Sequence, residues 1–214
     1  MKHARAVLFD LDNTLHDRDA GVRAFLAAQH GHLSLEEHDV ALERWTERFV
    51  LLEERGRVWK DLVYARLAEE FGLPHPPESL LGGYVRGFAR HVVPHEGMRE
   101  TLAVLHKEGW RTGVVTNGRS AFQRDTLAAL GIEPLLDVVV VSEERGLRKP
   151  SREIFELALR EIECDAEGSW FVGDDPVADV EGARSAGMRA VLFGGGGAPT
   201  LADVLRIVRA DEPR

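Results

Sequence analysis

Hydrophobic residues gather in short continuous runs at the beginning of the chain and through its second half. The runs span residues 6–9, 113–116, 138–141, 170–172 and 190–193. Runs without alternating polar positions are typical of strands that are buried on both faces of a parallel sheet. Between the runs, apolar residues recur at helical spacing, and Gly109 and Gly131 follow two of these stretches as stop signals. The alternation predicts an α/β fold with a doubly wound, Rossmann-like parallel sheet.

Residues 16–92 show a different pattern, with apolar stripes at helical spacing and no convincing strand. Ser34 and Glu37 have the spacing of a capping box, and a Pro-rich break after Gly72 closes a second stripe. The two stripes are Leu42, Trp45, Phe49 and Leu52, then Val58, Leu62 and Leu67, and a further helix is expected over about 78–90. We therefore expect residues 16–92 to form an all-helical cap inserted into an α/β catalytic core made of residues 1–15 and 93–214. The glycine run at 194–197 predicts a loop.

The composition narrows the class of protein. With a net charge of −9 over 214 residues, the chain lacks the basic excess that holds nucleic acid, whereas a small phosphorylated ligand remains compatible. Cys164 is the single cysteine, which excludes an intramolecular disulfide, and no motif around it favours a nucleophilic thiolate. No apolar run reaches the roughly 20 residues that cross a bilayer, and the N-terminus does not resemble a secretory signal. We expect a cytoplasmic monomer or dimer without nucleic-acid or membrane partners.

Two carboxylates stand directly after the first apolar run, at Asp10 and Asp12. The carboxyl end of a strand in an open α/β sheet is where ligands bind. Two acids this close together are costly unless a cation or a proton lies between them. The following Asn13 and Thr14 also suit an ordinary turn, so this segment alone leaves both interpretations open.

The later strand ends carry further polar groups. Thr116, Asn117 and Gly118 follow the second run, and a helix expected from about residue 120 would present its N-terminus to an anion. Lys149 comes after the apolar run at 138–141. The last group, which follows the run at 170–172, comprises Asp174, Asp175 and Asp179. Each group alone is compatible with a polar turn, a surface lysine or a helix cap. Their succession at four strand ends predicts one shared site.

This order of residues resembles the four motifs of the haloacid dehalogenase-like superfamily, over nearly the whole chain. The resemblance implies that Asp10 is the nucleophile, Asp12 the general acid and base, and Lys149 the base that steadies the phosphoryl group. It implies further that Thr116 binds phosphoryl oxygen with Asn117 and Gly118 nearby, that Asp174 ligates a metal, and that Asp179 supports it. Ala178 stands where many relatives carry Asn, and Asp175 has no assigned role. The insertion resembles the cap that such proteins carry between their first two motifs.

The chemistry expected of these residues is hydrolysis of small phosphate monoesters. A carboxylate nucleophile divides the reaction into two easier steps through an acyl phosphate, here a phospho-aspartate on Asp10. Mg²⁺ suits an oxygen-rich site, with ligands expected from the carboxylates of Asp10 and Asp174 and from the backbone carbonyl of Asp12. Thr116 and Lys149 would gather charge on the equatorial oxygens.

Three other functions remain open to the sequence. A dehalogenase of the same superfamily is disfavoured, because such enzymes lack an acid at the position of Asp12. A phosphosugar mutase uses the same pair of aspartates. A binding protein on this fold would be expected to have lost at least one of four residues, Asp10, Asp12, Lys149 and Asp174, and all four are present. The cap is expected to close over the site as a lid, with hinges near residues 16–21 and 92–97. His16, Arg18 and Arg23 either contact substrate or are ordinary solvated residues.

Overall fold

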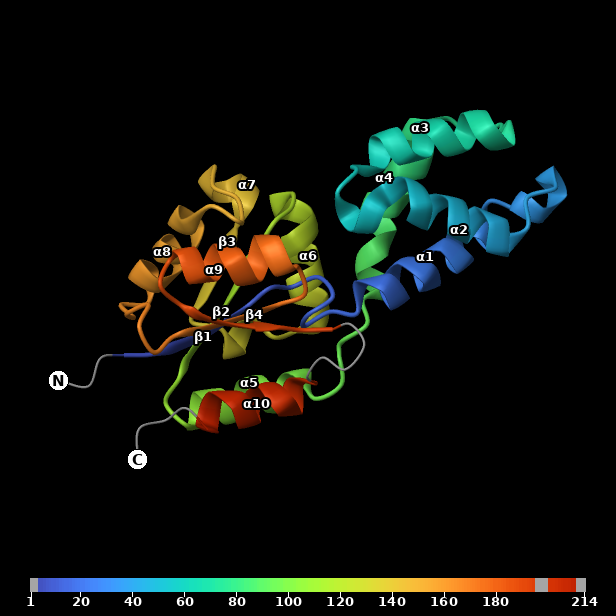
Figure 1. Ribbon diagram of the computed structural model, residues 1–214. Coiled ribbons are helices and arrows are strands. Elements are labelled where there is room, and N and C mark those ends of the chain that lie inside the picture. Colours follow the sequence, from blue (N-terminus) through green and yellow to red (C-terminus); the bar gives the residue numbers. More distant parts are fainter. Residues whose placement is uncertain (1–3, 195–199, 211–214) are drawn as a thin grey trace. The chain divides into compact units, whose positions relative to one another are not determined.

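The computed structural model describes residues 4–194 and 200–210 (Figure 1). The chain divides into two compact units, of which one holds the residues up to Asp17 and those from Pro94 onward, and the other holds Arg18–Val93. The two boundaries fall within the segments expected to act as hinges, and closure of a lid stays a prediction. Most of the glycine run at 194–197 lies outside the described residues.

The first unit is built on a parallel sheet of five strands in the order β3-β2-β1-β4-β5. All five apolar runs form strands, as predicted: β1 is Ala6–Phe9, β2 Arg111–Thr116, β3 Val138–Val141, β4 Trp170–Gly173 and β5 Arg189–Leu192. The first strand of the chain is central, paired with β2 on one side and β4 on the other. The carboxyl ends of β1, β2 and β4 therefore meet at one edge of the sheet.

Helices cover both faces of this sheet. In Figure 1, α5 (Met98–Lys107) and α10 (Leu201–Ala210) lie together on one face, while α8 (Arg152–Glu161) and α9 (Gly182–Ser185) lie on the other. The remaining helices are α6 (Ser120–Leu130), the short α7 (Ser142–Arg145) and a π-helical turn over Pro176–Glu181. The predicted doubly wound α/β fold is confirmed.

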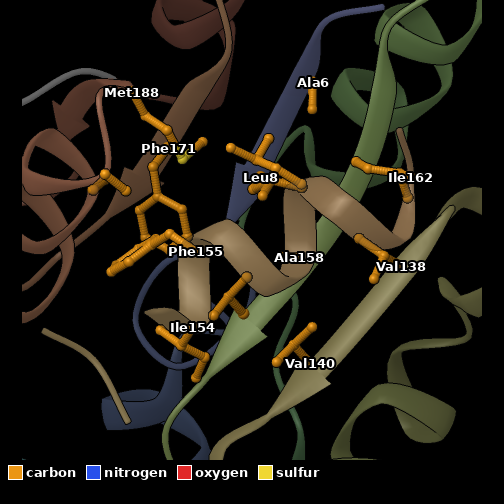
Figure 2. Packing of buried hydrophobic residues seen from close by; sticks show 14 residues of the cluster. Ala6, Leu8, Val138, Val140, Ile154, Phe155, Ala158, Ile162, Phe171 and Met188 are labelled. Carbon is orange, nitrogen blue, oxygen red and sulfur yellow. The ribbon is translucent and has the colours of Figure 1, made fainter. Parts of the chain in front are cut away.

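The core between α8 and the sheet fixes the strands that carry the site. Figure 2 shows Ile154, Phe155 and Ala158 of α8, and Ile162 directly after it, against Leu8, Val138, Val140 and Phe171 of the strands. The rings of Phe155 and Phe171 meet edge to face with centroids 4.9 Å apart. Burying one such ring is worth about 1.5–3 kcal/mol, so this contact helps to hold α8 against β4.

The second unit is entirely helical over Arg18–Val93, as expected for the insertion. Its elements are α1 (Arg18–His32), α2 (Leu42–Glu53), α3 (Lys60–Phe71) and α4 (Pro77–Gly87), with short 3-10 segments at Leu35–His38, Glu54–Gly56 and Phe88–His91. Trp45, Phe49, Tyr64 and Tyr84 are fully buried and form an aromatic core. Across both units, the described helices include none that is long and apolar enough to cross a membrane.

Two details of the predicted helical stripes are wrong. Ser34 has a left-handed backbone (φ 49°) and its side chain caps nothing, so the expected capping box does not form and α2 begins only after Ala41. Leu62 is 61% exposed, whereas its neighbours Val63 and Tyr64 are buried. The buried face of α3 therefore runs through Val63 and Tyr64 to Leu67, and of the predicted positions on this helix Leu67 is buried and Leu62 is not.

A cluster of charged groups is buried inside the helical unit. Glu53 accepts two hydrogen bonds from the Arg18 guanidinium at 2.9 and 2.5 Å, and Lys60 Nζ lies 2.7 Å from the same carboxylate. Arg18 therefore is not a solvated residue, whereas Arg23 is exposed.

Candidate active site

Asp10 and Asp12 lie on a tight turn that begins where β1 ends. The backbone N–H of Asp10 still donates to Val172 O of β4 at 2.8 Å, which anchors its position at the sheet edge. The N–H groups of Leu15 and His16 then both donate to Leu11 O, and Asn13 adopts a left-handed conformation (φ 59°) that Asn tolerates well. Because the strand ends before Asp12, the two carboxylates have different neighbours.

Lys149 joins the ends of the first and fourth strands. Its ammonium lies 2.6 Å from Asp10 Oδ1 and 2.7 Å from Asp179 Oδ1, and all three side chains are buried. Burial opposes the charged form of Lys149, but the two carboxylates outweigh it and raise the pKa of this lysine above its usual value. Lys149 is thus a permanent cation between two acids.

Asp10, Asp174 and Asp179 form an acidic cluster in which one carboxylate oxygen of each lies within 4.8 Å of the others. Burial, together with the charges of Asp179 and Asp12, raises the pKa of Asp10 well above its usual range despite the opposing effect of Lys149. Three carboxylates beside a single lysine leave an excess of negative charge. An all-oxygen donor set with that excess fits a hard divalent cation such as Mg²⁺. The side chain of Asp12 is not a member of this cluster.

The loop after β4 holds Asp175 and Asp179 in place through hydrogen bonds to its backbone. Asp175, whose role was unassigned, caps the π-helical turn by accepting from the N–H groups of Val177 and Ala178, both at 2.9 Å. Asp179 Oδ2 accepts from the N–H of Asp175 at 3.0 Å, which orients its other oxygen toward Lys149. A Cβ on Gly173 would lie 2.3 Å from Asp179 Oδ2, so only glycine admits this approach.

The residues after β2 are brought to the same edge, but they do different things. Asn117 holds the backbone of Lys149, donating from Nδ2 to its carbonyl and accepting from its N–H, both at 3.0 Å. The N–H of Gly118 donates to Ser142 Oγ at 3.0 Å. The side chain of Asn117 and the N–H of Gly118 therefore both bind other protein groups. Thr116 Oγ1 is linked to Asp12 by Gln123, whose Nε2 donates to both residues.

Gln123 is a site residue that the sequence analysis missed. It is 1% exposed on α6, and its Nε2 donates to Thr116 Oγ1 at 2.7 Å and to Asp12 Oδ2 at 3.1 Å, with Asn117 O at 3.3 Å. The buried positions of α6 are Gln123, Thr126, Leu127 and Leu130. A glutamine at helical spacing from Leu127 and Leu130 was the signal that could have revealed it.

Comparison with known proteins places this geometry in a family. The model of the haloacid dehalogenase-like hydrolases matches residues 4–187. A glyceraldehyde 3-phosphate phosphatase from Methanothermobacter thermautotrophicus is 31% identical over 198 residues, covering 88% of this chain and 84% of the relative. A ribulose-1,5-bisphosphate 5-phosphatase from Halopiger xanaduensis is 32% identical over 202 residues, covering 89% and 84%.

A solved structure agrees with these sequence matches. The crystal structure of a HAD phosphatase from Thermococcus onnurineus is 27% identical, with a TM-score of 0.67 over 95% of this chain and 97% of that chain. The likeness therefore extends over both the α/β and the helical parts of the sequence.

Proposed function

The chain belongs to the haloacid dehalogenase-like hydrolase family, and on that premise we propose that it hydrolyses small phosphate monoesters through a phospho-aspartate formed on Asp10. The class of enzyme, a phosphoric monoester hydrolase, follows from the family together with relatives that are phosphatases. The names of both relatives give a phosphorylated sugar as the substrate, which favours phosphosugars and similar small metabolites as the substrate class of this protein. The observation that carries the proposal is the buried contact of Asp10 with Lys149 beside Asp174 and Asp179.

Asp10 is the proposed nucleophile because it combines a fixed position with a neighbouring cation. Its carboxylate oxygen would form a bond to phosphorus while the bond from phosphorus to the ester oxygen breaks. Lys149 would neutralise charge on the phosphoryl oxygens and on Asp10 as the two negative groups approach each other. Asn117 would act here by holding the backbone of Lys149.

Mg²⁺ is the proposed cofactor, held by the carboxylates of Asp10 and Asp174 and by the backbone carbonyl of Asp12, with Asp179 in support. The oxygen-only cluster supports this assignment. When bound, the ion would offset the repulsion between Asp10 and the phosphate of the substrate.

Asp12 is the proposed general acid and base. It would donate a proton to the departing alkoxide and later take one from the water that attacks phosphorus and releases Asp10. Thr116 would donate its hydroxyl hydrogen to a phosphoryl oxygen, with the loop through Asn117 and Gly118 beside it. An acid at this position is what hydrolysis of an ester requires, since the leaving oxygen needs a proton.

A screen of phosphate release over phosphorylated metabolites tests the proposal. We expect release from small phosphosugars in the presence of Mg²⁺, loss of release with excess chelator, and recovery when Mg²⁺ is restored. Release without any second sugar acceptor separates a phosphatase from a phosphosugar mutase. Absence of release from every compound would contradict the proposed function, and full activity in excess chelator would contradict the proposed cofactor.

A further inference from the structure

Gln123 connects two groups to which the proposed reaction gives different tasks. Its amide nitrogen lies 2.7 Å from Thr116 Oγ1 and 3.1 Å from Asp12 Oδ2, and the whole side chain is buried. An amide NH₂ has two hydrogens, so it can serve these two nearest acceptors at once, while a third acceptor, Asn117 O, lies farther away at 3.3 Å. The neighbouring acceptors identify this atom as nitrogen, because an amide oxygen there would face a carboxylate oxygen.

The contact with Thr116 decides the direction of the threonine hydroxyl. A hydroxyl oxygen that accepts from Gln123 keeps its own hydrogen for a different acceptor. The structure thus leaves the hydroxyl hydrogen of Thr116 available to an anion, while one of the two lone pairs of Oγ1 accepts from Gln123. In the proposed reaction that anion is the phosphoryl group.

The contact with Asp12 distinguishes the two oxygens of its carboxylate. Oδ2 accepts from Gln123, whereas Oδ1 is buried and has no hydrogen-bond partner within the described part of the chain. An oxygen that already accepts a hydrogen bond is the poorer site for a proton. The arrangement leaves Oδ1 as the oxygen that carries the proton to and from the reacting groups.

We propose that Gln123 is a positioning residue, which orients Asp12 for proton transfer through Oδ1 and Thr116 for donation to the phosphoryl group. The proposal rests on the proposed function of Asp12 and Thr116. Gln123 itself contacts neither substrate nor metal in this account. Gly118 contributes to this positioning, because a Cβ at that position would lie 2.8 Å from Gln123 Cγ and would displace the glutamine side chain.

The test compares an alkyl and an aryl phosphate, because an alkoxide needs the proton of Asp12 more than a phenolate does. Gln123→Met keeps the length of the side chain and removes both donated hydrogen bonds. We expect kcat on the alkyl ester to fall about 10- to 100-fold, as misplacement of a catalytic group does, with a clearly smaller fall on the aryl ester. Gln123→Glu, which has the same shape but no donor, should lose at least as much. Gly118→Ala should shift the ratio of the two rates in the same direction.

Combination with Asp12→Asn tests whether Gln123 acts through Asp12. In the Asp12→Asn background, Gln123→Met should leave the ratio of alkyl to aryl rates unchanged, since the group that it orients is gone. A ratio that shifts as much as in the wild-type background would overturn the proposal.

Gln29 offers a matched control in the helical unit. It is also buried, accepting from Tyr64 Oη at 2.8 Å and donating to Leu80 O at 3.3 Å. Gln29→Met should lower the stability of the fold and leave the ratio of alkyl to aryl rates unchanged. If Gln123→Met preserves both rates, or lowers both by one factor, Gln123 does not orient Asp12. If the wild-type protein hydrolyses neither ester, the proposed function fails first and this inference fails with it.

Discussion

Replacing Glu53 by glutamine would test the buried charge cluster that organises the helical unit. Glu53 is 1% exposed and takes two hydrogen bonds from Arg18, while the Lys60 ammonium lies 2.7 Å away. Glutamine has nearly the same shape as glutamate, so the substitution removes the negative charge that Arg18 and Lys60 share and replaces one accepting oxygen by a donor NH₂. The two cations then stay buried at the same distance from each other.

The expected loss is large because the cluster is shielded from water. Removing one partner of a buried ion pair costs about 3–5 kcal/mol, whereas an exposed pair is worth about 0–1 kcal/mol. Arg48 and Glu70 form such an exposed pair, which is also bidentate but has about a third of each side chain accessible (32% and 31%). We expect Glu53→Gln to lower the free energy of unfolding by about 3–5 kcal/mol. Glu70→Gln should lower it far less, because water screens the exposed pair.

The same cluster predicts a pH dependence of stability. Burial raises the pKa of Glu53, but the hydrogen bonds and charge of Arg18 and the charge of Lys60 outweigh it and lower the pKa below its usual value of 4.5. A depressed pKa in the folded state means that the contribution is complete above about 4.5 and is lost as the pH falls through the folded value. The difference in stability between wild type and Glu53→Gln should therefore shrink in acid below that range.

Urea unfolding combined with hydrogen exchange resolved to the helices of Arg18–Val93 would measure these effects. Exchange separates this unit from the α/β unit, which need not unfold in the same step. Equal small losses for Glu53→Gln and Glu70→Gln would refute the assignment of the cluster as a buried ion network. A constant difference from pH 7 to pH 3 would refute the role of the Glu53 charge.

One further substitution and one chemical modification probe the α/β unit. Gly173→Ala should reduce phosphatase activity by at least about 10²-fold, because its Cβ would meet Asp179 Oδ2 at 2.3 Å and displace it from Lys149. Gly31→Ala, where no atom lies within 4 Å of the added Cβ, is the control, and equal rates for the two variants would contradict the steric argument. Burial raises the pKa of Cys164 to about 11, so alkylation of the folded protein at pH 8 should be about 10²-fold slower than that of the unfolded chain. Alkylation at the same rate in both states would show that the thiol is not shielded.

The strands and the principal site residues were predictable because their signals are local. Continuous apolar runs such as 138–141 are typical of strands in a sheet that is covered on both faces. Asp10, Lys149 and Asp174 each follow such a run, and parallel strands end at one edge. Their proximity thus follows from topology once the strands are known.

The features that were missed depend on contacts between residues far apart in the chain. Gln123 reaches Asp12 across 111 positions, so its spacing from Leu127 and Leu130 could have marked it as buried but could not have revealed its partner. Asp175 takes its role from the π-helical turn that follows it, whose start is set by packing against β4 and β5. The capping box at Ser34 failed because its backbone is left-handed there, which no pairwise spacing reveals.

Trapping the covalent intermediate tests the central claim most directly. The protein would be mixed with Mg²⁺ and a phosphosugar that it hydrolyses, quenched in acid within one turnover, and digested for mass spectrometry of the peptide that contains Asp10 and Asp12. We predict a phosphoryl group on Asp10, present in Asp12→Asn and absent in Asp10→Asn. Phosphate on any other residue, or a phosphorylated Asp10→Asn protein, would contradict the assignment of Asp10 as the nucleophile.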